Sequence, residues 1–464
     1  MPYHAYLLDK MRSLVQQKPL SFHTPGHKNG TLLPPALAEI WGTDFARYDL
    51  TELDGLDNLH FSSGCIAQSQ QQAAEIWQCR QAFYLVNGTS GGLQAAIMAA
   101  CRHKQVFVPR HAHRSIYHSL ILAQAEPIYL PITIDEATGL PLGVAPETLA
   151  DYMARYPQCR RLIMVHPTYQ GLTWRNADVL ALAKAHGLTV IVDEAHGSHL
   201  HFHPDLPPSL LDLGADLVVQ SWHKTLPVLT QGSALLVGES YQGEPLEPLL
   251  SLLQTTSPSY LTMASLEAGS IWMGEHGTRV LSSALQTYEQ FFDRLATLTT
   301  IRRSWEPAWH QDPFKLYLLS DRLSGPELAQ RLQQEYAIYV EMSDAGGCLL
   351  ILPLAAEVAE LERLWQALAA IDRSSETLPP RAAQMAFYCR EIPKQALTLT
   401  DAFYRPKRQI RWSEASGEIA GSFIIKYPPG IPICVPGEII TPPLVKQWLA
   451  DETADPWVTI ISKE

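Results

Sequence analysis

The sequence of 464 residues lacks several features that would assign a protein to a class at once. It has no apolar run of about 18 residues, the length that a membrane-spanning helix requires. Its seven cysteines are scattered singly without a CxxC pair, which favours reduced thiols over a disulfide framework or a zinc finger. The N-terminus lacks the apolar segment of a signal peptide. We therefore expect a cytoplasmic protein that does not bind membranes.

Positive charge is also scarce in this sequence. There are 35 lysines and arginines against 47 aspartates and glutamates, so the formal net charge is -12. That balance disfavours nucleic acid and anionic membranes as partners. Hydrophobic residues make up 46% and charged residues 18% of the chain, and these proportions are typical of a globular protein. The length allows two or three domains with a large core.

Residues 65–300 show a regular alternation of helical segments and short apolar runs. Strands separated by helix-length segments indicate a mostly parallel sheet that is covered by helices on both faces. We therefore predict a large α/β domain over 65–300. Its predicted strands are at residues 82–86, 105–109, 127–132, 161–166, 189–196, 215–221 and 233–238.

The remainder of the chain has three further parts. Residues 1–64 are predicted to be an N-terminal amphipathic helix followed by an extended arm that is rich in Gly, Pro and Asp. Residues 301–374 combine strand-like and amphipathic helical segments, which predicts a small α+β domain. Residues 375–464 form a C-terminal segment that is rich in turns and then helical.

The stretch "QSWHKT" at 220–225 places Ser221, His223 and Lys224 at the end of a buried strand. A buried lysine is costly unless it is paired, neutralised or used covalently. The alternative is that the strand reaches the surface here and that the lysine is solvated. These six residues alone do not decide between the two interpretations.

Two other strand ends carry polar residues. In "VNGTSGG", a strand leads into Thr89, Ser90 and Gly91 at the start of a helix, where backbone N–H groups and hydroxyls suit a phosphate. In "VIVDEAH", Asp193 ends an apolar strand and needs a cationic partner. The alternatives are a capped turn in the first motif and a helix cap or a core salt bridge in the second.

Four histidines follow Asp193, at positions 196, 199, 201 and 203. Such a cluster suggests a metal site. The run is interrupted by Gly197 and Pro204, however, and does not present the histidines on one face of a helix. We therefore expect no metal.

The three strand ends together match the needs of one cofactor, pyridoxal 5′-phosphate. This cofactor requires a lysine for a Schiff base, a carboxylate against its pyridine nitrogen and a phosphate site. Lys224, Asp193 and the turn at 88–92 supply these groups at strand ends, where open α/β sheets bind ligands. We therefore predict that the lysine is used covalently.

The sequence also resembles a known family, the bacterial type of pyridoxal-phosphate-dependent ornithine/lysine/arginine decarboxylases. It resembles the short form without a wing domain. The resemblance implies the aspartate-aminotransferase-like fold (PLP fold type I) and the α-decarboxylation of a basic amino acid, with arginine favoured. The matching motifs are FHTPGHKNG (22–30), LTELDGLDNLH (50–60), NGTSGG (87–92), DEAHGSHLHFH (193–203), VQSWHKTLPVLTQGS (219–233) and YPPGIPICVPGE (427–438).

The resemblance and the chemistry together imply a role for each site residue. Lys224 forms the Schiff base and Asp193 pairs with the pyridine nitrogen. His113, in "RHAHRS", stacks on the ring. The phosphate and the remaining cofactor contacts come from Thr89, Ser90, Gly91, His196, Ser221 and His223.

A basic substrate needs a carboxylate for its distal cation, and the sequence offers several. Glu438 in "PGE" is the substrate-binding residue that we predict. Other acids are in the arm and in the small domain, namely Asp54, Asp57, Glu341 and Asp344.

The sequence departs from the family pattern at two places. In "RHAHRS", His111 and Arg114 replace an asparagine and a lysine. Near the C-terminus, Glu418 stands where the family has an arginine. The second change reverses a charge and bears on the choice of substrate.

Other functions remain open from sequence. An aminotransferase or an aldolase/lyase can use the same fold and cofactor, because fold does not decide the reaction. A catalytically idle regulator that binds the cofactor is a third possibility. The resemblance further implies a homodimer, or an assembly of dimers, with active sites that are shared between subunits.

Overall fold

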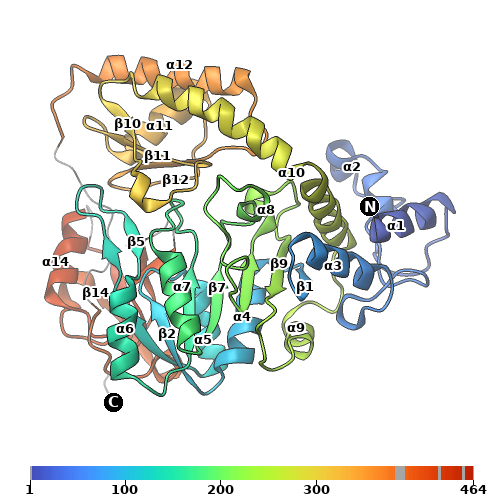
Figure 1. Ribbon diagram of the computed structural model, residues 1–464, viewed down its shortest axis with the longest axis horizontal. Coiled ribbons are helices and arrows are strands. Elements are labelled where there is room, and N and C mark those ends of the chain that lie inside the picture. The colour runs from blue at the N-terminus through green and yellow to red at the C-terminus, as the bar shows by residue number, and fades with distance from the viewer. Residues whose placement is uncertain (1–2, 382–391, 427–429, 452–454, 463–464) are drawn as a thin grey trace. The chain divides into compact units, whose positions relative to one another are not determined.

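The computed structural model describes residues 3–381, 392–426, 430–451 and 455–462 (Figure 1). The chain divides into two compact units. Unit 1 comprises Met1–Ala100 and Ile191–Ala284, and unit 2 comprises Cys101–Val190 and Leu285–Glu464. Each unit is built from two segments, whereas the predicted domains are continuous, and the predicted domain limits stay predictions.

Unit 1 contains the N-terminal arm and the strands that carry the predicted cofactor residues. Four of its strands follow the order β1-β9-β8-β7. Its elements, including those that lie mostly in this unit, are α1 (Tyr6–Gln16), α2 (Pro35–Trp41), η1 (Phe45–Arg47), η2 (Leu59–Phe61), α3 (Cys65–Ile76), β1 (Gln81–Leu85), α4 (Gly88–Cys101), β7 (Thr189–Asp193), η3 (Leu200–Phe202), β8 (Leu217–Gln220), α8 (Trp222–Thr225), β9 (Ser233–Val237), α9 (Glu247–Leu253) and α10 (Tyr260–Leu295).

Strands β7 and β8 are parallel, and their register places Asp193 opposite Val219. Strand β9 runs antiparallel to both β8 and β1. All five residues of β9 are buried, as expected for a strand with a neighbour on each side. The register therefore brings the end of β7 beside the residues that precede Ser221.

A stack of aromatic rings supports the end of β8. The rings of Trp77 and Trp222 are parallel with centroids 4.2 Å apart, and Tyr84 meets Trp222 edge to face. All three side chains are fully buried. Helix α1 is attached to this unit through Glu267, whose two carboxylate oxygens accept the N–H groups of residues 7 and 8. Of these contacts, the aromatic stack supports Trp222, the first residue of α8.

Unit 2 contains three parallel strands in the order β6-β2-β3, a small antiparallel sheet and the C-terminal segment. Its elements are β2 (Gln105–Pro109), α5 (Arg114–Ala123), β3 (Glu126–Leu130), β4 (Thr133–Ile134), β5 (Pro141–Gly143), α6 (Pro146–Arg155), β6 (Arg161–Val165), α7 (Asn176–Ala185), β10 (Ile301–Arg303), η4 (Pro307–Trp309), β11 (Lys315–Ser320), α11 (Gly325–Tyr336), β12 (Met342–Ser343), β13 (Gly347–Ile351), α12 (Val358–Ser375), α13 (Leu399–Tyr404), β14 (Lys407–Arg411), η5 (Trp412–Glu414), β15 (Ile424–Lys426), β16 (Ile431–Cys434), α14 (Pro442–Asp451) and β17 (Trp457–Ile461).

The small sheet has the order β10-β11-β13-β12, and α11 packs against it and against α12 (Figure 1). This arrangement agrees with the α+β character predicted for 301–374. The C-terminal segment has its own core, built around Trp412, Ile433 and Ile460. Residues 427–429, the first three of the motif YPPGIPICVPGE, lie outside the described residues.

Candidate active site

Strand β7 ends at Asp193, whose side chain is 7% exposed. Residues 190–192 before it are fully buried, as the apolar run predicts. Its Oδ1 atom accepts the N–H of Ala195 at 3.2 Å. Burial raises the pKa of Asp193, and the positive charge of Lys224 opposes part of that rise. A buried carboxylate in this setting suits a cationic ring nitrogen.

Strand β8 leads through Ser221 into the four-residue helix α8, which carries Lys224. The Nζ atom of Lys224 lies 3.0 Å from Nε2 of His196. A hydrogen bond between two basic nitrogens requires that at least one of them is neutral. Burial, followed by the charge of Lys224, lowers the pKa of His223 and so favours its neutral ring.

The third predicted motif forms the first turn of α4. Gly88 has a φ of +77°, and a Cβ atom on Gly91 would collide with the side chain of Asn87. The Thr89 hydroxyl bonds the hydroxyl of Ser221 and lies 3.3 Å from that of Ser233. The start of α4 is therefore tied directly to the end of β8.

These contacts bring six of the predicted cofactor residues into one region of unit 1. Their chemistry fits pyridoxal 5′-phosphate. Backbone N–H groups at the start of α4, with the exposed Ser90 beside them, suit the phosphate. Asp193 suits the ring nitrogen and Lys224 supplies the amine. The contacts run through Thr89, Asp193, His196, Ser221, His223 and Lys224.

Sequence reasoning missed Glu194, which is fully buried behind this region. Its carboxylate accepts the Ser209 hydroxyl at 2.8 Å, the N–H of Leu210 at 2.9 Å and the Gln220 amide at 2.6 Å. Gln220 in turn accepts the indole N–H of Trp222 at 3.0 Å. Burial raises the pKa of Glu194 to about 7. The network joins the end of β7 to the first residue of α8, and the polar residue after Asp193 was its only sequence signal.

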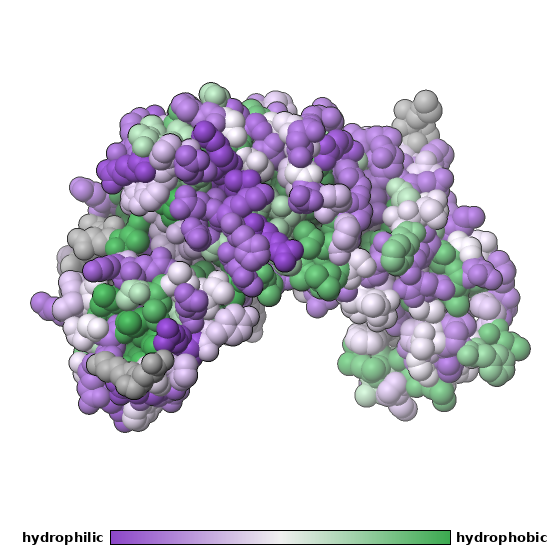
Figure 2. All heavy atoms as spheres, turned by 90° about the horizontal axis from the view of Figure 1, so that it is seen from below, coloured by the Kyte–Doolittle hydropathy of each residue, from purple (hydrophilic) through white to green (hydrophobic). Residues whose placement is uncertain are grey.

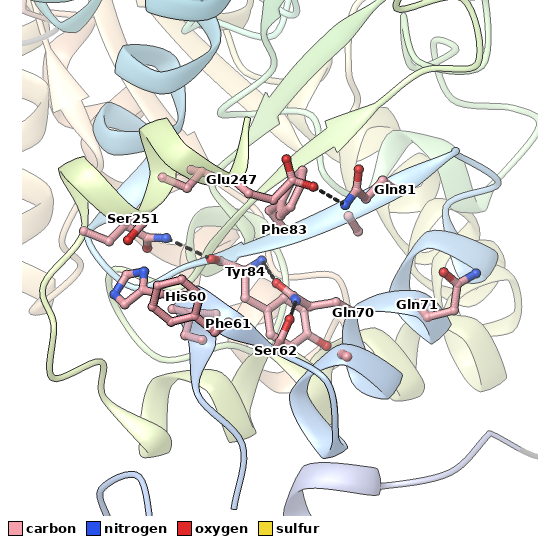
Figure 3. Close-up of a pocket in the computed structure, with 15 residues that line it drawn as sticks. His60, Phe61, Ser62, Gln70, Gln71, Gln81, Phe83, Tyr84, Glu247 and Ser251 are labelled. Atoms are coloured by element: carbon pink, nitrogen blue, oxygen red, sulfur yellow. Dashed lines mark hydrogen bonds between the residues drawn. The ribbon is translucent and has the colours of Figure 1, made fainter. Parts of the chain in front are cut away.

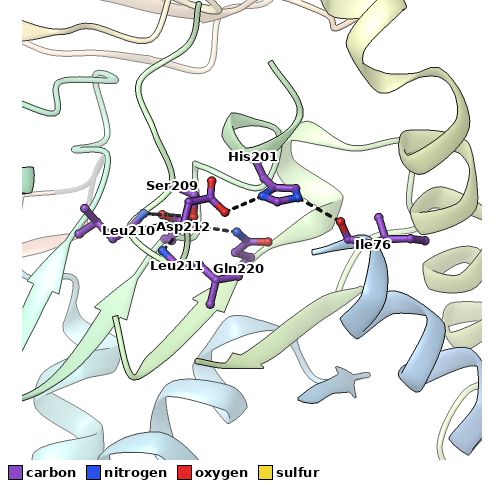
Figure 4. A network of polar contacts seen from close by, with 8 residues as sticks. Ile76, His201, Ser209, Leu210, Leu211, Asp212 and Gln220 are labelled. Atoms are coloured by element: carbon purple, nitrogen blue, oxygen red, sulfur yellow. Dashed lines mark hydrogen bonds and ion pairs between the residues drawn. The ribbon is translucent and has the colours of Figure 1, made fainter. Parts of the chain in front are cut away.

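The histidines that suggested a metal have other partners. His201 lies between Asp212, at 2.6 Å, and the carbonyl oxygen of Ile76, at 3.0 Å (Figure 4). His203 bonds the hydroxyl of Ser282 at 2.8 Å. Within the described ranges, no group of three or more His, Cys, Asp or Glu side chains is arranged to hold a metal ion.

His113 belongs to unit 2, where it caps the N-terminus of α5. Its Nδ1 atom accepts the N–H of Ser115 at 3.2 Å and lies 2.8 Å from the hydroxyl of that residue. Because Nδ1 is an acceptor, the neutral ring carries its proton on Nε2. The cap thus fixes both the ring and its tautomer, while the stacking of His113 on a cofactor stays a prediction.

Glu438 is fully buried in unit 2, and its carboxylate already has partners. Its Oε2 atom lies 2.8 Å from Nη2 of Arg110 and accepts the N–H of Val435 at 2.8 Å. A carboxylate that is neutralised in this way is a poor ligand for the cation of a substrate. The predicted substrate contact of Glu438 gains no support from this arrangement and stays a prediction.

Three of the other four acids proposed from sequence also have hydrogen-bond partners, and one of them, Glu341, accepts the hydroxyl of Tyr169 at 2.6 Å. Asp57 accepts the N–H groups of Gly64, Ile66 and Ala67 at 2.7–3.1 Å and thereby caps α3. Asp344 accepts the hydroxyl of Tyr317 at 2.6 Å and backbone N–H groups of its own turn. These two carboxylates have structural tasks, and Asp54 is the exposed one in the arm.

The two departures from the family pattern have different surroundings. His111 is buried, and burial lowers its pKa to about 4, so that the ring is neutral. Arg114 is exposed, and its backbone N–H donates to the carbonyl oxygen of Gly430 at 3.2 Å. Glu418 lies 3.8 Å from Arg408, so an ion pair accommodates the reversed charge.

A separate pocket of about 360 Å³ lies beside β1 in unit 1 (Figure 3). Gln70 and Gln254 bond the backbone of β1 there, through the N–H of Tyr84, its carbonyl oxygen and the N–H of Val86. These amides satisfy groups on the strand edge that faces away from β9. The lining residues differ from the predicted cofactor residues. The Gln70 and Gln254 side chains in the pocket satisfy backbone groups of the strand and the residue after it.

Two family models match the sequence. The model "Orn/Lys/Arg decarboxylase, major domain" matches residues 6–322, and "Orn/Lys/Arg decarboxylase, C-terminal domain" matches residues 382–451. The chain belongs to the Orn/Lys/Arg decarboxylase family. This confirms the resemblance carried by the six motifs. In the part of the chain that the structure describes, no helix is long and apolar enough to span a membrane.

Curated relatives include arginine decarboxylases from several bacteria. The protein from Bacillus subtilis is 34% identical over 441 residues, which cover 93% of this chain and 90% of that protein. The protein from Halalkalibacterium halodurans is 31% identical over 437 residues, which cover 92% of this chain and 89% of that protein. Both matches therefore span about nine tenths of each protein.

Solved structures confirm the fold. The constitutive lysine decarboxylase of Escherichia coli superposes with a TM-score of 0.85 at 18% identity, over 99% of this chain and 82% of that one. An L-threonine transaldolase from Pseudomonas fluorescens, solved in its internal aldimine state, superposes with a TM-score of 0.54 at 18% identity. The superposition covers 67% of this chain and 72% of that one. The fold is the predicted α/β, aspartate-aminotransferase-like PLP fold type I.

Proposed function

We propose that this chain removes the α-carboxyl group of arginine with pyridoxal 5′-phosphate bound at Lys224. The observation that supports this most is the set of contacts among Thr89, Ser221, His196 and Lys224 in a chain of this family. When bound, the cofactor supplies an electron-withdrawing ring that stabilises the charge left on Cα after the carboxyl group departs. The protein residues bind and orient the cofactor and control its protons.

In this proposal, the main cofactor-binding residues of unit 1 have defined tasks. Lys224 binds the aldehyde carbon and needs an unprotonated amine for it, and His196, 3.0 Å away, is an acceptor for the ammonium proton. Asp193 holds a proton on the ring nitrogen by its negative charge. Thr89 and Ser90 bind the phosphate together with the N–H groups that begin α4.

His113 is proposed to lie against the face of the cofactor ring. The support is the family motif and the fixed orientation of this imidazole at the N-terminus of α5. A flat ring that cannot turn freely would hold the cofactor in one orientation. It would also exclude water from the face that it covers.

Arginine is proposed as the substrate because relatives with 34% and 31% identity over most of the chain are arginine decarboxylases. In the test, the purified protein is supplied with the cofactor and, separately, with arginine, lysine or ornithine. Carbon dioxide and the amine products are identified by mass spectrometry, with Lys224→Ala as the inactive control. We expect the highest kcat/KM with arginine.

Each other outcome of this test has a defined meaning. A higher kcat/KM with lysine or ornithine would refute arginine but retain the decarboxylase. Formation of a keto acid without carbon dioxide would indicate an aminotransferase instead.

We also propose that the chain forms a homodimer through its N-terminal arm. Leu20, Phe22 and Ile40 are each at least 75% exposed, and Trp41 and Phe61 are exposed as well. Figure 2 shows hydrophobic side chains at the surface on the right-hand side of the view, where the N-terminal segment lies. A large exposed apolar patch favours contact with another protein surface. A second copy of this chain would bury the same patch twice around a twofold axis.

Sedimentation velocity tests the dimer. Wild-type protein should sediment as a dimer, and Leu20→Ser/Phe22→Ser should shift it towards monomer. Leu252→Ser, which changes an exposed leucine of α9, is the matched control and should leave the dimer intact. A monomeric wild type at micromolar concentration would refute the proposal.

A cytoplasmic location is also proposed. The six cysteines that the structure describes are free thiols, and five of them are buried. Reduced cysteines are typical of a reducing compartment. Fractionation of cells that produce the protein would test the location.

A further inference from the structure

Arg110 and Glu438 form a buried ion pair in unit 2. The Nη2–Oε2 distance is 2.8 Å, and the side chains are 2% and 0% exposed. The same Nη2 atom donates to the carbonyl oxygen of Ile433 at 3.1 Å. The guanidinium also lies over the ring of Tyr129, 5.3 Å from its centroid. The pair is therefore held in one geometry from several sides.

Such a pair is poorly explained by stability alone. Removing two charges from water costs free energy that their attraction only partly recovers, and apolar residues of similar volume are often at least as stable. The ion pair does fix one arrangement between residues that are 328 positions apart in the sequence. This suggests that the role of the ion pair is to fix this arrangement.

The segment that Arg110 fixes is the 110–114 loop, which joins β2 to α5. At its beginning, the carbonyl oxygen of Arg110 accepts the hydroxyl of Tyr117 at 3.3 Å. At its end, the N–H of Arg114 donates to the carbonyl oxygen of Gly430 at 3.2 Å. Ile433 and Glu438 of the C-terminal segment hold the beginning of the loop through the Arg110 side chain, Gly430 holds its end, and His113 lies between these two points.

We propose that the Arg110–Glu438 pair positions His113. The C-terminal segment holds the 110–114 loop, and the loop together with the cap of α5 sets the orientation of the His113 ring. Glu438 then acts through Arg110 and does not contact the substrate. This inference rests on the proposed function, in which His113 lies against the cofactor ring.

The test compares the double variant Arg110→Gln/Glu438→Gln with wild type. Removing both charges avoids leaving one buried charge without its partner, so this variant is better suited to folding than either single change. A misplaced ring should lower kcat by between about tenfold and a hundredfold, with KM changed by less than about twofold. The circular dichroism of the bound cofactor in the visible range should weaken, because it reports the orientation of the ring.

The decisive step repeats the double change in a His113→Ala background. If the pair acts through His113, the two charges no longer matter there, and kcat should change by less than about twofold. An equal fold-loss with and without His113 would overturn the proposal and leave a structural role. A large rise in KM with unchanged kcat would also overturn it and make Glu438 a substrate ligand.

A matched control and a second readout separate this inference from the proposed function. The control is Arg294→Gln/Glu362→Gln, which removes a half-exposed ion pair of unit 2 and should alter neither kcat nor the dichroism. If the wild type decarboxylates no basic amino acid, the proposed function fails, but the dichroism still tests the pair. A signal that is lost in His113→Ala and unchanged in Arg110→Gln/Glu438→Gln would then overturn the inference.

Discussion

At the ends of β7 and β8 in unit 1, buried and half-buried polar groups contact one another at short distances. In unit 2, the buried acid Glu438 has a cation and a hydrogen-bond donor of its own. Lys224 and His196 are two bases in contact. Glu438, in contrast, has Arg110 and a backbone N–H as partners. The first arrangement leaves a proton to be shared between the two nitrogens.

The comparison shows that residue type alone does not identify a ligand-binding acid. Asp193 and Glu438 are both buried carboxylates at ordered positions, and burial raises the pKa of each. The two carboxylates differ in the cation near them. The cation near Glu438 is the guanidinium of Arg110, which several contacts hold in place, whereas the cation near Asp193 is the amine of Lys224. The following predictions test whether the two regions really differ in this way.

Lys224→Ala should have the largest effect. Without the amine, the protein cannot bind the cofactor covalently, and kcat should fall on the order of 10³-fold or more. Lys104→Ala, at an exposed position, is the control and should match wild type. Steady-state assays and the visible spectrum measure the effect. Near-normal activity in Lys224→Ala would mean that Lys224 does not bind the cofactor covalently and that the two regions do not differ as proposed.

Asp193→Asn should keep the cofactor bound but slow the reaction by at least about tenfold, or 1.4 kcal/mol in the barrier. The neutral amide cannot hold a proton on the ring nitrogen as a carboxylate does. Asp212→Asn removes an acid that pairs with His201 and should leave kcat nearly unchanged. Equal effects of the two changes on kcat would mean that Asp193 has only a structural task.

Glu194→Gln should change the pH dependence of stability. The folded state raises the pKa of Glu194 from 4.5 to about 7, so it binds the proton more tightly than the unfolded chain does. This group therefore lowers the free energy of unfolding as pH rises from about 4.5 to 7, by up to about 3 kcal/mol. The variant should show a smaller fall in Tm between pH 5 and pH 8.

A matched control accompanies that measurement. Glu75→Gln, at an exposed position of α3, should retain the pH dependence of the wild type. An unchanged pH profile in Glu194→Gln would mean that this carboxyl group is not held in its neutral form by the fold.

Asp57→Ala should have the smallest effect and should appear in stability alone. Its carboxylate caps α3, and the loss of such a cap costs about 1–2 kcal/mol. Thermal denaturation should show a lower Tm, while kcat and KM for arginine stay near wild type. Asp54→Ala is the exposed neighbour for comparison. A raised KM in Asp57→Ala would return this residue to the list of substrate ligands.

Local patterns in the sequence predicted most of the fold. Each of the seven apolar runs corresponds to a strand, from β1 to β9, and 301–374 forms an antiparallel sheet with two helices. The arm contains α2, which begins at Pro35 where proline suits the first turn of a helix, but sequence reasoning read this stretch as irregular. One strand of that small sheet, β12, is only two residues long.

Residues of the candidate site could be proposed from sequence where they follow strand ends, and less readily where their partners are distant in the sequence. Asp193 and Lys224 stand out because polar residues follow apolar runs. The partner of Glu438 is 328 positions away, so no local pattern reveals that its charge is already neutralised. Glu194 was missed for a related reason, since Ser209 and Gln220 become its neighbours only after folding.

The most direct test of this account is to locate the cofactor on the chain. The purified protein is treated with borohydride, which makes the covalent link between cofactor and lysine permanent, and its peptides are analysed by mass spectrometry. We predict a single modified lysine, Lys224, and no modification in a sample from which the cofactor was removed beforehand. A modification at another lysine, or none in a protein that retains the cofactor and its activity, would contradict the account.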